Sequence, residues 1–106
     1  MASIKYEHRD LDVACTLGAT QRDGRQAQWH LLREQSGLGT EPIPDGIRIW
    51  LRPQARALAE SLARQEADCC GFLDLELASD GGRLRLDITS PAAEAAPVIA
   101  WLAGMP

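Results

Sequence analysis

Residues 73–88 read LDLELASDGGRLRLDI, two runs of alternating apolar and charged residues on either side of a glycine pair. Alternation with a period of two is typical of strands that bury one face. The segment therefore predicts an antiparallel hairpin with its turn at Asp80-Gly81. The outward positions are acidic in the first run and mostly basic in the second, so we expect them to pair across the strands.

Two segments upstream of the hairpin show the same strand period. Residues 11–17 alternate in a way that directs Cys15 toward the core, and residues 47–52 alternate an apolar face with an Arg-Trp-Arg face. Both are predicted to be strands. Residues 37–46 are rich in glycine and proline and are predicted to form a surface connection or a lid.

Three helices are predicted around these strands. They run from Thr20 to a stop at Gly37, from Pro53 to a stop at Gly71, and from Ser90-Pro91 through Leu102, where Pro97 either kinks the helix or marks its first turn. The resulting order is βαβαββα. We expect an α+β fold in which residues 1–106 form one two-layer domain, with a mostly antiparallel four-stranded sheet and the helices on one face. Residues 1–10 are expected to be loosely ordered.

The composition narrows the classes of function. A chain of 106 residues with 45% hydrophobic content suffices for one packed core. A net charge of −4 without a basic run argues against direct nucleic-acid binding. No apolar run is long enough to span a bilayer and none opens the N-terminus, so we expect a cytoplasmic protein with no membrane partner.

The three cysteines carry the most chemical information. In a reducing compartment they are expected to be free thiols, metal ligands or redox groups. Cys69 and Cys70 close the second predicted helix, and a disulfide between neighbours would be strained. The C-terminal end of a helix disfavours a free thiolate but favours a bound cation. The pair therefore indicates ligation of a cation more than nucleophilic attack.

A third ligand would complete such a site, and the inward-facing Cys15 is the candidate. Three thiolates suit soft species such as Hg(II), As(III) or Cu(I), and Zn(II) if Glu66 or a histidine supplies a fourth ligand. The alternative is that the cysteines are ordinary core residues, because free cysteine is among the most buried residue types.

Glu66 lies one helical turn before the cysteine pair, on the same apolar stripe. A carboxylate in that position needs a partner, either a backbone amide or an arginine. Beside thiolates it could also serve as a proton donor or acceptor if the protein is an enzyme. The sequence leaves both roles open.

Two tryptophans are further candidates for binding. Arg25 and Trp29 lie four residues apart on one face of the first predicted helix, where they could stack, line a pocket or anchor the core. Trp50 lies on the Arg-Trp-Arg face of the strand at residues 47–52. If nothing covers that face, Trp50 indicates a surface for a partner.

Three motifs together resemble a family of small bacterial proteins and domains of unassigned biochemical function. They are Cys15-Thr16-Leu17, the Arg-x-x-x-Trp helix from Arg25 to Trp29, and Glu-x-x-Cys-Cys-x-Phe from Glu66 to Phe72. Such segments are also similar to domains appended to DNA-binding modules of the mercury-resistance-regulator type. The resemblance implies thiophilic-metal or stress biology, and it carries no established activity with it. Gly71 stands where that motif leads us to expect proline, and glycine loosens this corner.

The leading hypothesis is thiol-dependent binding or sensing of a soft metal or metalloid, with Cys69 and Cys70 as primary ligands, Cys15 as the third and Glu66 as a neighbouring proton acceptor or donor. One alternative is an enzyme that cleaves organomercurials or performs thiol redox chemistry with the same groups. Another is an interaction domain that partners a transcription regulator or forms a homodimer through the face that carries Trp50.

Overall fold

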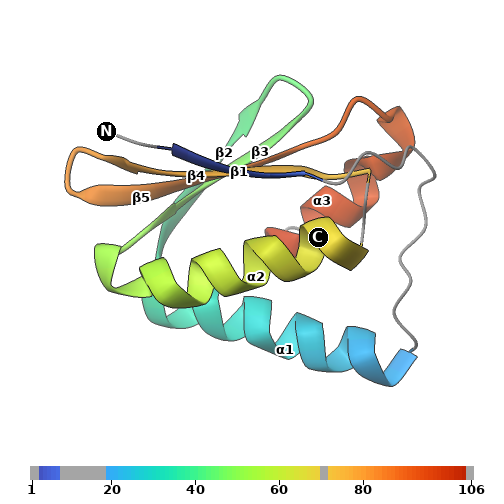
Figure 1. The fold of residues 1–106 in the computed structure, drawn as a ribbon, viewed down its shortest axis with the longest axis horizontal. Coiled ribbons are helices and arrows are strands. Elements are labelled where there is room, and N and C mark those ends of the chain that lie inside the picture. Colours follow the sequence, from blue (N-terminus) through green and yellow to red (C-terminus); the bar gives the residue numbers. More distant parts are fainter. Residues whose placement is uncertain (1–2, 8–18, 70–71, 105–106) are drawn as a thin grey trace.

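The computed structural model describes residues 3–7, 19–69 and 72–104 (Figure 1). The described chain forms one five-stranded antiparallel sheet, in the order β1-β4-β5-β3-β2, and three helices that lie on the same side of it. The elements are β1 (Ser3–Glu7), α1 (Ala19–Ser36), β2 (Gly37–Ile43), β3 (Gly46–Leu51), α2 (Arg56–Cys69), β4 (Asp74–Asp80), β5 (Arg83–Thr89) and α3 (Ala96–Leu102). Short 3-10 turns at Pro53–Ala55 and Ala93–Ala95 lead into α2 and α3. The α+β class is confirmed.

The predicted hairpin is present as β4 and β5, which occupy the middle of the sheet with β3. Its turn lies one residue later than predicted, because Asp80 still pairs with Arg83 and the two turn residues are Gly81 and Gly82. Both glycines have positive φ, 60° and 82°. Two-residue hairpin turns that match the twist of the strands require this conformation at both positions, and glycine adopts it without strain.

The prediction of four strands in the order βαβαββα is wrong, because the described chain has five strands. Residues 37–46, predicted as a loop or lid, contain β2, and residues 1–10, expected to be loosely ordered, contain β1. Both are edge strands, and β2 is exposed along most of its length, so it lacks the alternating apolar pattern by which strands are recognised. The predicted strand at residues 11–17, which includes Cys15, lies outside the described residues.

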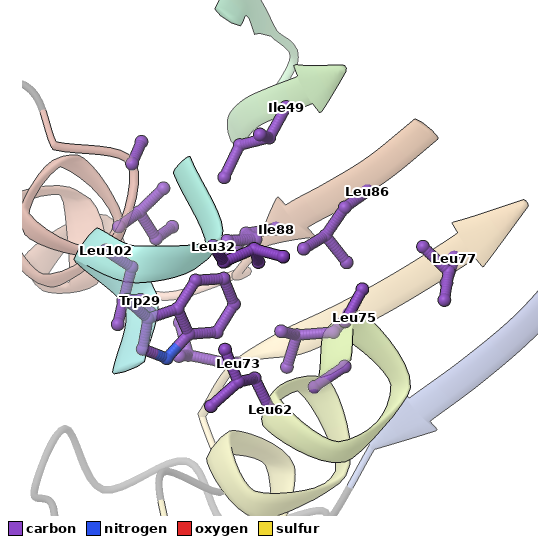
Figure 2. Close-up of a cluster of buried hydrophobic side chains, with 14 of the residues drawn as sticks. Trp29, Leu32, Ile49, Leu62, Leu73, Leu75, Leu77, Leu86, Ile88 and Leu102 are labelled. Carbon is purple, nitrogen blue, oxygen red and sulfur yellow. The ribbon is translucent and has the colours of Figure 1, made fainter. Parts of the chain in front are cut away.

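The core fills the space between the sheet and the helices. The inward side chains of β3, β4 and β5 meet buried residues of α1, α2 and α3 in one cluster (Figure 2). The largest fully buried members are Trp29, Leu32, Ile49, Leu51, Leu62, Leu73, Leu75, Leu77, Leu84, Leu86, Ile88 and Leu102. This cluster fixes α1 and α2 side by side against the sheet, and so determines which of their polar side chains can meet (Figure 1).

The last helix is shorter than the sequence indicates. Ser90 accepts a hydrogen bond from the Ala92 amide at 3.1 Å and donates one to the Phe72 carbonyl at 2.6 Å. Its hydroxyl therefore stabilises a turn rather than the first turn of α3. Pro97 lies in the first turn of α3, where proline is tolerated because the N–H that it lacks has no partner within the helix.

A Gly46→Ala variant should lose about 1–3 kcal/mol of unfolding free energy, the usual cost of overpacking. A Cβ atom at Gly46 would lie 1.9 Å from the carbonyl oxygen of Ile88 on β5, so the two strands would have to separate. Urea denaturation measures the change. Gly24→Ala is the control, because a Cβ there meets nothing within 4 Å and alanine favours the helix. A Gly46→Ala variant as stable as Gly24→Ala would contradict the prediction.

Candidate functional site

A buried carboxylate links the two long helices. Glu66 of α2 is 2% exposed, and its Oε1 atom accepts hydrogen bonds from Arg25 Nη1 at 2.8 Å and from Trp29 Nε1 at 3.2 Å. Both donors belong to α1, one helical turn apart. The Arg-x-x-x-Trp motif and the first residue of the Glu-x-x-Cys-Cys motif are therefore parts of one cluster, which we call the α1–α2 clamp.

The helical spacing of both segments produces this meeting. Residues four apart share a face of a helix, so Arg25 and Trp29 both point toward α2. Trp29 is 1% exposed and its ring lies among Leu32, Leu62 and Leu73 (Figure 2). Trp29 thus anchors the core with its ring and donates from its indole nitrogen, the usual arrangement for a buried tryptophan.

Burying the charged side chains of the clamp costs free energy unless they remain paired with each other. The side chains of Arg25 and Glu66 are only 10% and 3% exposed. Removing two charges from water costs several kcal/mol per ion, and the cost is offset only by close pairing and further hydrogen bonds. A guanidinium and an indole N–H on one carboxylate oxygen meet that requirement, so the geometry is that of an anchor between helices.

The cysteine pair lies three and four residues after Glu66 in the sequence. Cys69 is the last residue of α2, one turn beyond Glu66. Cys15 and Cys70 lie outside the described residues, and within the described part no group of three His, Cys, Asp or Glu residues is arranged to hold a metal ion. The next described residues after α2, Phe72 and Leu73, are 2% and 0% exposed. In the sequence, the pair is therefore bracketed by buried residues.

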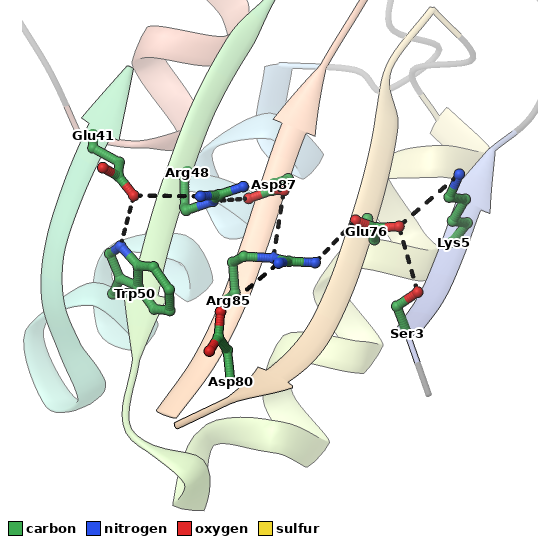
Figure 3. Close-up of polar contacts among 9 residues, drawn as sticks. All are labelled: Ser3, Lys5, Glu41, Arg48, Trp50, Glu76, Asp80, Arg85 and Asp87. Carbon is green, nitrogen blue, oxygen red and sulfur yellow. Dashed lines mark hydrogen bonds and ion pairs between the residues drawn. The ribbon is translucent and has the colours of Figure 1, made fainter. Parts of the chain in front are cut away.

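Trp50 lies on the face of the sheet opposite the helices (Figure 3). Its indole nitrogen donates to Glu41 Oε1 at 3.0 Å, and the guanidinium of Arg83 lies 4.0 Å from the centre of its ring. Contacts of this kind, a cation over an aromatic face, are favourable. Local partners on β2 and β5 therefore account for the position of Trp50.

Charged side chains cross the same face in alternating order. Arg48 pairs with Asp87 through two hydrogen bonds of 2.8 and 3.1 Å, Arg85 contacts Asp87 and Glu76, and Glu76 contacts Lys5 (Figure 3). The hydrogen bond to Asp87 raises the pKa of Arg48 above its usual value. The predicted pairing of acidic and basic residues across β4 and β5 is confirmed by the contact of Arg85 with Glu76.

Two features were not predicted from the sequence. A cavity of about 310 Å³ lies between the β2–β3 turn and the start of α3, lined mainly by small apolar residues together with Asp45 and Ser90. Arg33 of α1 donates to the carbonyl of Leu102 at the end of α3, and burial lowers the pKa of its guanidinium. Neither has a local sequence signal, because both depend on segments far apart in the chain.

Within the described ranges, no helix is both long and apolar enough to cross a membrane. No known protein family, curated protein or solved structure matches the chain.

Proposed function

We propose that this protein binds or senses a soft metal or metalloid through its thiols in the cytoplasm. Cys69 and Cys70 are the primary ligands and Cys15 is the third, which suits Hg(II), As(III) or Cu(I). Zn(II) would need a fourth ligand. The partner that would respond to the bound ion is a transcription regulator or a second copy of the chain.

The observation that supports this proposal most is the position of Cys69 at the end of an anchored helix. α2 ends at Cys69, and the clamp holds its last turn against α1 through Glu66. The carbonyl groups at a helix C-terminus give this end a negative partial charge, which favours a cation held by adjacent thiolates. The last residue of this anchored helix is a cysteine, which supports a cation site at this helix end.

The anchoring of Glu66 also bears on the enzyme alternative. Cleavage of a carbon–mercury bond requires a group that delivers a proton to the leaving carbon. Oε1 of Glu66 accepts from Arg25 and Trp29, so in the described structure this oxygen joins α1 to α2. This arrangement supports binding more than turnover.

Anaerobic titration of the reduced protein with Hg(II), arsenite and Cu(I) tests the proposal. We expect the parent protein to bind one ion per chain and Cys69→Ser/Cys70→Ser to bind none, because both primary ligands are gone. Cys15→Ser should bind arsenite more weakly than the parent, since two thiolates replace three. If the double variant binds as tightly as the parent, the proposal is wrong.

A further inference from the structure

We propose that the cavity between the β2–β3 turn and α3 binds a small organic amine, with the ammonium group on the carboxylate of Asp45 and the apolar body of the ligand inside the cavity. The residues that carry this site all lie in the described part of the chain. The site involves none of the thiols, so it goes beyond the proposed function and does not depend on it.

The cavity has the size of a site for a small ligand. Its volume is about 310 Å³. Ligand pockets range from about 300 to 1,000 Å³, so this one is suited to a ligand at the small end of that range. Apolar cavities of about 150 Å³ bind benzene, and the space here therefore accommodates one ring with a short chain.

The lining of the cavity runs from solvent to the core. Asp45 is exposed, Ala92 is half-buried, and Ile99 of α3 is 3% exposed. The buried Ser90 hydroxyl donates to the carbonyl of Phe72 and accepts from the amide of Ala92, so its single proton is already used. The inner part of the cavity is therefore suited to an apolar group.

Asp45 supplies the charge of the site. It is the only charged residue among the described residues that line the cavity, and within the described chain its carboxylate forms no ion pair or hydrogen bond. Its backbone carbonyl accepts from the Ser90 amide at 3.0 Å, which holds the turn against the end of β5. An unpaired carboxylate beside apolar surface favours a ligand that has both a positive charge and an apolar body.

The backbone of Asp45 provides a second observation. Pro44 and Asp45 are the two residues between β2 and β3, and Asp45 has a φ of 64°. Aspartate tolerates this left-handed conformation better than most residues do, but glycine adopts it without strain. The turn alone therefore does not require a carboxylate here. Residues held in such conformations are often found at ligand sites.

The order of charge and apolar surface distinguishes a free amine from other ligands. A carboxylate repels anions, and a neutral ligand gains only the apolar contacts, whereas an ammonium group also gains a charge-assisted hydrogen bond. A lysine side chain of a partner protein carries its charge at the tip, which would enter the apolar part first. The cavity therefore fits a free amine better than a lysine.

Three probes of similar shape test the charge preference, namely phenethylamine, phenethyl alcohol and hydrocinnamate. Amide chemical-shift titrations at neutral pH measure where and how tightly each one binds. The amine should bind about tenfold more tightly than the alcohol, the effect of one hydrogen bond to a charged group. Hydrocinnamate should bind more weakly than both, and the amides that shift should include those of Asp45, Ile47 and Ala92.

Asp45→Asn removes the charge but keeps the shape, and asparagine also tolerates a positive φ. This variant should bind the amine about tenfold more weakly, as expected for the loss of that hydrogen bond, and the alcohol within about twofold of the parent. Asp80→Asn is the matched control, because Asp80 is 50% exposed and lies at the opposite end of β4 and β5. It should bind every probe like the parent.

Ala92→Leu places a larger side chain in the lining and should weaken binding of both the amine and the alcohol, so it tests the site even if Asp45→Asn fails to fold. Equal affinity of the parent for the amine and the alcohol would overturn the proposal. So would equal weakening by Asp45→Asn and Asp80→Asn, which would show an effect of net charge alone. Shifts confined to residues outside the lining would show that the cavity is not the site.

Discussion

An Arg25→Met variant is expected to lose about 3–5 kcal/mol of unfolding free energy, because the substitution removes the cation that accompanies a buried carboxylate. Glu66 is 2% exposed, so water cannot replace the lost guanidinium without opening the space between α1 and α2. The effect is large for a small domain, whose total stability is typically about 5–15 kcal/mol. Urea denaturation followed by far-UV circular dichroism at neutral pH measures it.

Two further variants show whether the loss comes from the buried charge. Arg25→Met/Glu66→Leu removes both charges and should regain most of the lost stability, since apolar pairs often replace buried ion pairs without cost. Glu60→Gln breaks a partly exposed pair on the same helix as Glu66 and should cost less than about 1 kcal/mol. A double variant no more stable than Arg25→Met would contradict the explanation.

The central part of the fold was predictable because its residues bury one face. Residues 73–77, 83–88 and 47–51 alternate, since the apolar side chains of these stretches of β3, β4 and β5 face the core. The helices were recognisable for the same reason, with α1 ending before Gly37 and the second helical segment opening at Pro53. Burial on one side imposes a period on the sequence, and the period identifies the element.

The edge strands were not predictable on the same grounds. β2 has the sequence GLGTEPI, with five consecutive exposed residues, and it is a strand because β3 offers it a row of backbone hydrogen-bonding groups. Its glycines, proline and glutamate are residues typical of loops and also of edges that avoid further pairing. Such a segment is determined by its neighbour in the sheet rather than by its own side chains.

The candidate site was predictable in parts but not as a whole. The spacing of Arg25 and Trp29, and a glutamate within the apolar stripe of α2, were each visible, as was the need for a partner to that glutamate. The identity of the partner was not, because Arg25 and Glu66 are 41 residues apart and meet only after both helices have packed against the sheet. Periodicity gives the face of each helix, whereas packing decides which faces meet.

A Trp29→Ala variant is expected to lose about 3–5 kcal/mol of unfolding free energy, the typical cost of truncating a buried tryptophan. The ring is 1% exposed and lies at the centre of the contact between α1, α2 and the sheet, so its loss leaves a cavity that Leu32, Leu62 and Leu73 cannot fill (Figure 2). The variant also loses the indole donor to Glu66. Urea denaturation provides the measurement.

Trp29→Phe separates the two contributions of Trp29, because it keeps most of the apolar ring and removes only the N–H group and some volume. Its loss should be smaller than that of Trp29→Ala but at least about 1.5–3 kcal/mol, the contribution of a hydrogen bond to a charged group. Trp101→Phe is the matched control at a position that is 38% exposed, where we expect a change within about 0.5 kcal/mol. If Trp29→Phe is as stable as Trp101→Phe, the hydrogen bond from Trp29 to Glu66 contributes nothing to stability, and this prediction is wrong.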